Sequence, residues 1–373
     1  MANLVLKTER DVADLTLGAT FFGVGGGGTA AEGQKLLGRE LAAGGELPVV
    51  PAGEIPDDIW TVSVSFMGNR APLTEEQEKQ KLRLGLTEWK YENNLVEAVR
   101  FLQEVTGKKV GAIVVPELGG ANTPAPLSVA AHLGIMAVDA DYSGRALPEV
   151  AQFGLRFAGY GIAPLASVDK WGNKTVIYET VNESLAERIG KLLATAAFGN
   201  TGLAFGLVRG AEMKKSVVPG TVSECHALGR AIREAREAGR NVPEAILAHT
   251  GGTKLFTGTV TEKDWSVTDG YYDGYHTLAG EGEFAGHTLK TWFRNETHIA
   301  WLDGEPHVTA PDLIGQVRTD DGQPLLNNEV VAGDRLTFIG LPARPMHLRP
   351  EALPLLAPRH YGFDIDYLPL RAQ

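Results

Sequence analysis

The sequence predicts an α/β N-terminal part, with a largely parallel or mixed sheet, followed by a β-rich C-terminal domain. Up to about residue 244, buried apolar runs of strand length alternate with amphipathic helical segments, as in βαβ units. From about residue 245, apolar and polar residues alternate between Gly, Asp and Asn turns, which is typical of antiparallel strands. The 373 residues exceed what one core usually serves, so we expect two domains, 1–172 and 173–373.

The individual elements follow from apolar periodicity and from the residues that end each run. Thr8 and Asp11 form a capping box before a helical apolar face that reaches Phe21, and Gly107 is a helix C-cap. In order, we expect helices over 29–42, 93–107, 127–134, 182–198 and 221–239, and strands over 58–68, 109–117, 135–141, 174–179 and 202–208. The second domain then consists of a helix-and-strand segment, 173–244, and β-rich stretches at 255–278, 287–317 and 333–342.

Composition excludes several classes of protein. Lys and Arg number 35 against 46 Asp and Glu, a net charge of −11, and no basic stripe alternates with aromatic residues, so no nucleic-acid partner is expected. No apolar segment approaches the roughly 18 residues that a membrane span needs, and the first residues carry no targeting pattern, so we expect a cytoplasmic protein. Cys225 is the only cysteine, which excludes an intramolecular disulfide, and we expect it to be buried and structural.

A glycine run follows the first helix. Gly23, Gly25 and Gly28 satisfy G-x-G-x-x-G, but a dinucleotide fingerprint follows a strand and this run follows a predicted helix, so nucleotide binding is disfavoured. The glycines could instead bring bare backbone close to a polar substrate atom, or could simply allow a tight crossover of the chain. The glycines that would contact a substrate are Gly25, Gly26, Gly27 and Gly28.

Polar residues follow two neighbouring predicted strands. In open α/β sheets ligands bind beyond the carboxyl ends of the strands, so these residues are expected to surround one crevice. The carboxylates could position and deprotonate water, while the amide and the guanidinium hold a planar polar ring. Alternatively, Asp139 caps a turn and Arg145 only neutralises nearby carboxylates. The full set is Glu117, Gly119, Gly120 and Asn122 after the first strand and Asp139, Asp141 and Arg145 after the second.

Six motifs make the chain similar to a known family. "GVGGGGTAAEG", "VPELGGAN", "VDADYSGRALPE", "FRNET", "APDLIGQV" and "GFDIDYLPL" occur in this order and span nearly the whole chain. In this they resemble the S-methyl-thiohydantoin desulfurase family, whose members are often encoded beside hydantoinase/oxoprolinase-type enzymes. Many relatives carry Asp-Pro where this chain has Thr29-Ala30, so the substrate of this chain could differ.

The resemblance implies hydrolysis of a five-membered S-methylated thiohydantoin ring, which releases methanethiol and leaves a hydantoin. For this reaction we expect Asp139 or Asp141 as the base, with Arg145 and Asn122 at the ring carbonyl and Glu117 at a water or a ring N–H. The resemblance also implies substrate contacts from the second domain. The residues expected to supply them are Asn295, Glu296 and Asp312.

Two alternative functions stay open at this point. The chain could be a hydantoinase/oxoprolinase-like cyclic amide hydrolase, or a non-catalytic partner subunit of such an enzyme. No cofactor is certain, although an oxygen-rich group of carboxylates could hold a divalent metal such as Mg²⁺ or Mn²⁺. We expect a homo-oligomer with a small cyclic substrate, no membrane association and, as a further partner, a hydantoinase-type enzyme.

Overall fold

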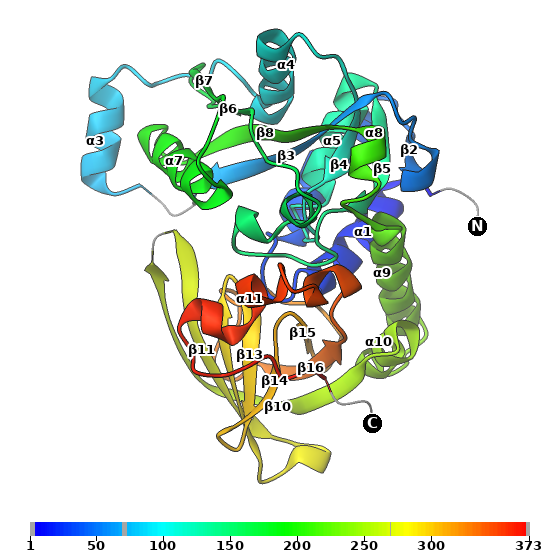
Figure 1. Cartoon of the computed structure of the whole chain (residues 1–373). Coiled ribbons are helices and arrows are strands. Elements are labelled where there is room, and N and C mark those ends of the chain that lie inside the picture. The colour runs from blue at the N-terminus through cyan, green and yellow to red at the C-terminus, as the bar shows by residue number, and fades with distance from the viewer. Residues whose placement is uncertain (1–3, 69–72, 269, 371–373) are drawn as a thin grey trace.

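The computed structural model describes residues 4–68, 73–268 and 270–370. The molecule is built around two sheets (Figure 1). A nine-stranded sheet in the order β1-β2-β5-β4-β3-β8-β6-β7, with β9 beside β5, occupies the upper part of Figure 1. A seven-stranded sheet in the order β14-β13-β12-β11-β10-β16-β15 occupies the lower part. The predicted α/β part and β-rich part are therefore confirmed.

The nine-stranded sheet is mixed, because only its centre is parallel. Strands β2, β5, β4 and β3 run parallel, and the described strands beside them pair antiparallel. The bounds are β1 Val5–Leu6, β2 Leu47–Pro51, β3 Trp60–Gly68, β4 Val110–Val115, β5 Met136–Asp141, β6 Leu165–Val168, β7 Lys174–Ile177, β8 Asn200–Arg209 and β9 Val218–Pro219.

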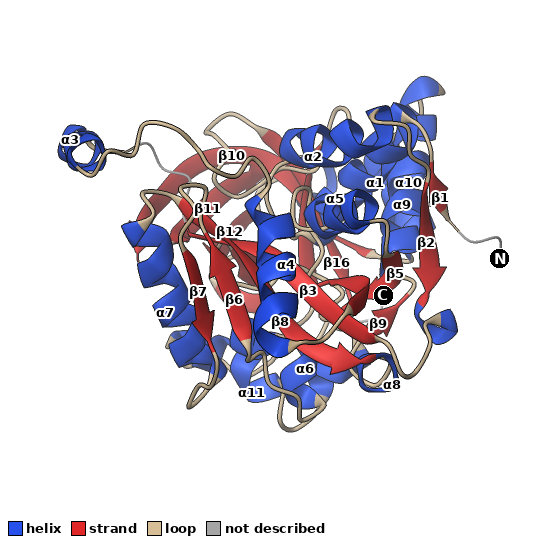
Figure 2. Ribbon diagram, turned by 90° about the horizontal axis from the view of Figure 1, so that it is seen from above, coloured by secondary structure: helices blue, strands red, loops and turns tan. Residues whose placement is uncertain are grey.

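Helices cover both faces of this sheet. Helices α1, α4, α5 and α9 bury their apolar sides in one core with Ile113 and Ala137, whereas α7 packs on the opposite core, which holds Val114 and Val138. Helix α3 stands apart from the sheet in both views and buries no residue (Figures 1 and 2). The bounds are α1 Glu9–Phe22, α2 Ala30–Ala42, α3 Glu75–Arg83, α4 Asn94–Thr106, α5 Pro124–Leu133, α6 Gly154–Phe157, α7 Glu183–Ala196, α8 Gly210–Met213, α9 Thr221–Glu237, α10 Val242–Thr250 and α11 Leu353–Leu356.

The second sheet is antiparallel throughout its described pairs and encloses a core of its own, which includes Phe256, Ile314 and Phe338. Its bounds are β10 Thr253–Thr268, β11 Tyr271–Gly280, β12 Thr288–Arg294, β13 Glu296–Leu302, β14 Glu305–Thr309, β15 Leu313–Arg318 and β16 Arg335–Leu341.

The strongest local predictions are confirmed. Thr8 and Asp11 form the capping box of α1, and Gly107 ends α4 with a left-handed backbone at φ +67°. The predicted helices and strands up to residue 239 each coincide with an observed element to within a few residues. Strand β8 and helix α9 come after residue 172 in the chain, yet they belong to the first sheet and its helical layer.

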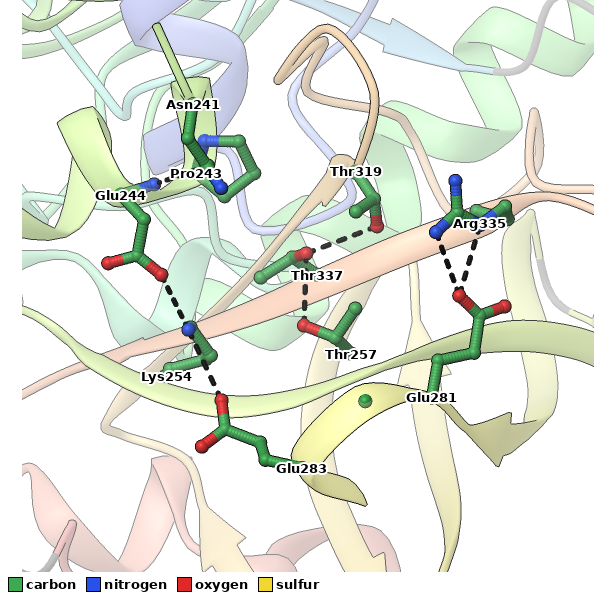
Figure 3. Close-up of a pocket in the computed structure, with 11 residues that line it drawn as sticks. Asn241, Pro243, Glu244, Lys254, Thr257, Glu281, Glu283, Thr319, Arg335 and Thr337 are labelled. Carbon is green, nitrogen blue, oxygen red and sulfur yellow. Dashed lines mark hydrogen bonds and ion pairs between the residues drawn. The ribbon is translucent and has the colours of Figure 1, made fainter. Parts of the chain in front are cut away.

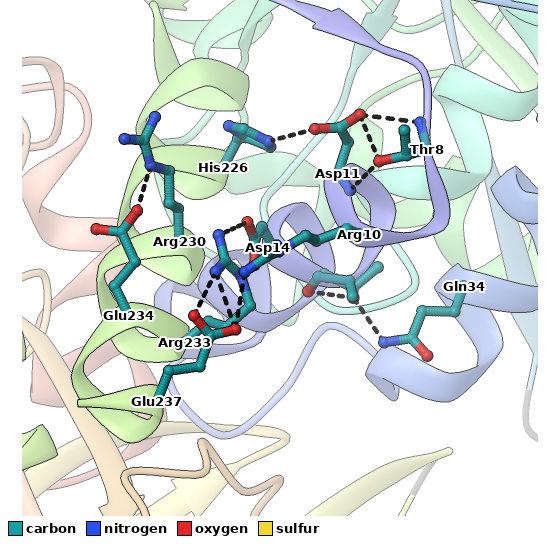
Figure 4. A network of polar contacts seen from close by, with 12 residues as sticks. Thr8, Arg10, Asp11, Asp14, Gln34, His226, Arg230, Arg233, Glu234 and Glu237 are labelled. Atoms are coloured by element: carbon teal, nitrogen blue, oxygen red, sulfur yellow. Dashed lines mark hydrogen bonds and ion pairs between the residues drawn. The ribbon is translucent and has the colours of Figure 1, made fainter. Parts of the chain in front are cut away.

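Helices α1 and α9 cross with almost no space between their backbones. A Cβ atom on Gly229 would lie 1.7 Å from the Asp14 carbonyl oxygen, and one on Gly18 would lie 1.9 Å from the carbonyl oxygen of buried Cys225. At one edge Arg233 donates two hydrogen bonds, of 2.8 and 2.9 Å, to the carboxylate of Asp14 (Figure 4). The two helices and this ion pair thus set the position where the glycine run leaves α1.

We predict that Gly229→Ala lowers the free energy of unfolding by about 3 kcal/mol or more, because the methyl group must push α9 away from α1. Gly38→Ala in α2 is the matched control, since nothing lies within 4 Å of a Cβ there and alanine favours helix by roughly 0.5–1 kcal/mol. Denaturant unfolding of both variants measures the difference. Equal stability of the two variants would contradict the close crossing.

Candidate active site

Three loops meet at the carboxyl ends of β4 and β5. The Gly27 carbonyl accepts hydrogen bonds from the backbone N–H groups of Ala121 and Asn122, at 3.1 and 3.0 Å. The carbonyl of Arg145 accepts one from the Leu118 N–H, at 3.2 Å. Direct backbone hydrogen bonds therefore join the loop after α1 to the loop after β4, and that loop to the loop after β5.

Bare backbone is essential where the glycine run crosses the loop after β4. A Cβ atom on Gly27 would lie 2.5 Å from the Cα of Gly119, and the φ of Gly27 is +78°. A Cβ on Gly120 would lie 2.5 Å from the Thr20 hydroxyl. Helix α2 is capped by its own Thr29, which accepts the Glu32 N–H at 3.3 Å. The glycines thus form a tight crossover, and no dinucleotide-type strand precedes them.

The same run also contacts the second sheet. Val24 accepts the Thr297 N–H at 2.8 Å, and Gly25 accepts the Asn327 N–H at 2.7 Å. A Cβ on Gly26 would lie only 1.9 Å from Oε1 of Glu296, so the absence of a side chain there makes room for that carboxyl group. One short segment therefore bridges the two sheets beside the strand ends.

Glu117 and Asn122 lie together, as the sequence predicted. Asn122 donates its Nδ2 hydrogen to Oε1 of Glu117 at 2.7 Å, and the Leu147 N–H donates to Oε2 at 2.7 Å. Both residues keep some accessible surface, although protein atoms closely surround the Glu117 carboxyl. That burial raises the pKa of Glu117 to about 8; the two hydrogen bonds oppose the rise, and the charges of Asp141 and Glu187 add to it. Glu117 is therefore protonated at neutral pH.

Arg145 is fully buried between the two sheets. Its Nε donates to the Ala146 carbonyl at 3.0 Å, and Nη1 donates to the carbonyls of Pro311 and Asp312 at 3.0 and 3.2 Å. Within the described chain Nη2 has no hydrogen-bond partner. Burial lowers the pKa of Arg145, while electrostatic interaction with the acidic groups of Glu296, Tyr361, Asp312 and Glu117 opposes this. Arg145 thus links the domains and still has one donor to offer.

Protein donors bind both carboxylate oxygens of Asp139 but only Oδ2 of Asp141; Oδ1 of Asp141 has no hydrogen-bond partner among the described residues. Both lie within β5 rather than beyond it. The Ser223 N–H and hydroxyl donate to the Asp139 carboxylate at 2.9 and 2.6 Å, which caps the first turn of α9. Oδ2 of Asp141 accepts the N–H groups of Ser143 and Gly144, at 3.0 and 2.6 Å, and the pKa of Asp141 rises to about 6 because the group is buried. Both aspartates hold turns, the alternative that the sequence left open for Asp139.

The second domain adds Glu296 at the start of β13. This carboxyl is buried, and its Oε2 lacks a partner among the residues that the structure describes. Burial raises the pKa of Glu296 well above its usual value, the charge of Glu117 adds to the rise, and Arg145 opposes it. Asn295, by contrast, forms the turn before β13 with φ +54°, and its Oδ1 accepts the Tyr272 N–H at 2.9 Å. The side chain of Asn295 therefore serves the turn.

Two residues beside this group were not predicted from the sequence. His298 is buried on β13, and its Nδ1 has no partner in the described part of the chain. Burial, then the charge of Arg145, lowers the pKa of His298 far below its usual value, so the ring is neutral. The Tyr361 ring lies 4.6 Å from the His298 ring, centroid to centroid. No local motif marks either residue, because only the long-range packing of β13 brings them to Arg145.

A hollow on the second sheet lies apart from this group of residues. The described residues contain no group of three or more His, Cys, Asp or Glu side chains arranged to hold a metal ion. A hollow of about 240 Å³ on the second sheet is lined by paired charges: Lys254 contacts Glu244 and Glu283, and Arg335 contacts Glu281 (Figure 3). It shares no residue with the group around Arg145.

The fold and this group of residues define a two-domain α/β plus β protein with a polar site at the junction of its sheets. The chain belongs to the S-Me-THD-like family: the model of its N-terminal domain matches residues 10–179 and that of its C-terminal domain matches residues 181–370. The chain is also similar to a crystal structure of a Chromobacterium violaceum protein, Northeast Structural Genomics Consortium target CvR68, with 25% identity and a TM-score of 0.77 over 99% of this chain and 100% of that one. A search of curated proteins found no match.

Across the described ranges, no helix combines the length and the apolar character that a membrane crossing requires.

The buried Glu117 carboxyl makes stability depend on pH. Its raised pKa means that the folded state holds a proton that the unfolded state releases, so its stabilising contribution is lost as the pH rises through about 8. We predict that the wild type loses more unfolding free energy between pH 5 and pH 9 than Glu117→Gln does. Denaturant unfolding at several pH values measures this, with Glu104→Gln on the surface of α4 as the control. Parallel curves for the wild type and Glu117→Gln would contradict a buried proton at this position.

Proposed function

We propose that this protein hydrolyses a small five-membered ring of the S-methyl-thiohydantoin type, releasing methanethiol and a hydantoin. Membership of the S-Me-THD-like family supports the choice of ring. The single observation that carries the proposal is the position of the partly accessible Glu117 carboxyl: Asn122 and the Leu147 N–H bind it, and its neighbour Leu118 donates to the carbonyl of Arg145, whose buried Nη2 has no partner among the described residues. An acid with a shifted pKa near a fixed cation is a common arrangement in acid–base and electrostatic catalysis.

In this proposal each residue has one task in the reaction. Water attacks the ring carbon that bears the S-methyl group. Glu117 donates its proton to the adjacent ring nitrogen as negative charge develops there. Nη2 of Arg145 donates a hydrogen bond to the ring carbonyl, and Asn122 fixes the orientation of Glu117. Asp139 and Asp141 hold the surrounding turns and do not act on the ring in this scheme.

We predict that Glu117→Gln lowers kcat/KM for methanethiol release by about 10²- to 10⁴-fold, because the acid is lost. In the wild type, activity should fall as the pH rises through about 8, since Glu117 then loses the proton it must donate. A colourimetric thiol assay with an S-methyl-thiohydantoin measures both. Asp139→Asn is the comparison variant: it should act through the stability of α9, with a smaller effect on kcat at temperatures where it stays folded.

The reaction products and the proteins that co-purify with the chain distinguish the proposed activity from its two alternatives. Ring opening without thiol release would identify a cyclic amide hydrolase of the hydantoinase type. Stable co-purification with a hydantoinase and no turnover by this chain alone would identify a non-catalytic partner subunit. Either result would overturn the proposed activity.

A further inference from the structure

Helix α3 forms an arm that buries none of its residues in its own chain. It stands apart from the first sheet in both views (Figures 1 and 2). Its stability comes from a capping box at Thr74 and from exposed ion pairs within the helix, such as that of Lys79 with Glu75 at 2.6 Å. A helix of 9 residues with only such local contacts is marginal in water, because helices this short depend on tertiary packing. The α3 arm therefore lacks a surface to pack on.

Exposed apolar side chains gather at the end of the molecule that carries this arm. Leu82 in α3 is 59% exposed, and Leu84 directly after the helix is 62% exposed. All but two of the large apolar side chains exposed in the described residues come from three places: the arm with the loop after it, α7 with the segment before it, and the last part of β10. These places lie at the same end of the molecule in both views (Figures 1 and 2). Single exposed apolar residues are ordinary, but such a concentration marks an interaction surface.

Helix α7 has apolar residues on two faces. Its inner face is buried at Ala186 and Gly190. On its outer face Leu185 and Leu192 are 41% and 62% exposed, and Arg188 lies between them. Spacings of three and four residues align these three side chains in one stripe, the α7 stripe, as on a helix that receives another helix. Within the described residues Arg188 makes no ion pair.

The α3 arm and the α7 stripe match in spacing and in charge. Glu78 and Leu82 lie four residues apart on α3, as Arg188 and Leu192 do on α7. Four residues advance an α-helix by about 6 Å, so two helices side by side in the same direction bring both pairs together at once. The leucines then pack on each other while Glu78 faces Arg188. Glu78 also contacts Lys81 in its own helix, an exposed pair that contributes little and leaves the carboxylate available.

We propose that this end of the molecule is the interface of a homodimer in which the α3 arm of each copy packs on the α7 stripe of the other. One chain carries both halves of the contact, as a two-fold axis requires, so the contact forms twice. The arm does not cover the stripe of its own chain, since Leu192 stays 62% exposed. A different protein bound to one half would leave the other half without a partner. The proposal concerns assembly and does not depend on the proposed activity.

Charge substitutions in each half test the contact. Sedimentation of the full chain at micromolar concentration should show a dimer. Leu82→Asp and Leu192→Asp should each raise the dissociation constant of the dimer at least about 10-fold, because each places a charge in an apolar contact. Leu348→Asp is the matched control: Leu348 is 45% exposed and lies outside the three places, so this change should leave the dimer intact.

A charge exchange identifies which helices meet. Arg188→Glu should raise the dissociation constant about 5-fold, and Glu78→Arg in the same chain should restore it, because the reversed pair attracts again. Thermal melting checks that each variant is folded. A monomeric wild type, or a dimer that Leu82→Asp and Leu192→Asp both leave intact, would overturn the proposal. Failure of the charge exchange to restore the dimer would overturn the pairing of α3 with α7.

Discussion

The packing of the two domains against each other depends on the hydrogen bonds of one buried cation, Arg145. Arg145 lies in the loop after β5 in the first domain, and its guanidinium donates hydrogen bonds to the carbonyls of Pro311 and Asp312 in the second domain. Burying a charge without hydrogen bonds is costly, so the two sheets meet in the register that lets these two bonds form. Truncating such a group leaves both carbonyls without their donor. The junction of the domains and the candidate site are therefore set by the same side chain.

The glycine run serves the same junction from the other side. Its backbone binds the loop after β4 through Gly27 and the second sheet through Val24 and Gly25. Because Gly26 has no side chain, the Glu296 carboxyl can approach to a distance that any Cβ would prevent. Access of Glu117 and Asn122 to solvent is retained beside this run. The glycine run thus serves both the packing of the two domains and the geometry of the site, which explains why so many glycines lie together.

Much of this could be predicted from the sequence, because it depends on local patterns. Apolar periodicity located the central strands and long helices, and the strand-end rule pointed to Glu117 and Asn122, which a hydrogen bond joins in the structure. Strand β2 was not predicted, because it contains Pro48 and Pro51 and prolines are uncommon within strands. The interactions of Asp139 with Ser223 and of Glu296 with Arg145 join residues far apart in the chain. No spacing rule encodes such contacts, so the division of tasks among the acids required the structure.

The most direct test of this account is a crystal structure of the protein with hydantoin bound. The account predicts that the ring lies at the junction of the two sheets, within hydrogen-bond distance of Glu117 and of Nη2 of Arg145. A ring bound elsewhere, such as in the hollow around Lys254 and Arg335, or held by Asp139 with Arg145 untouched, would contradict it.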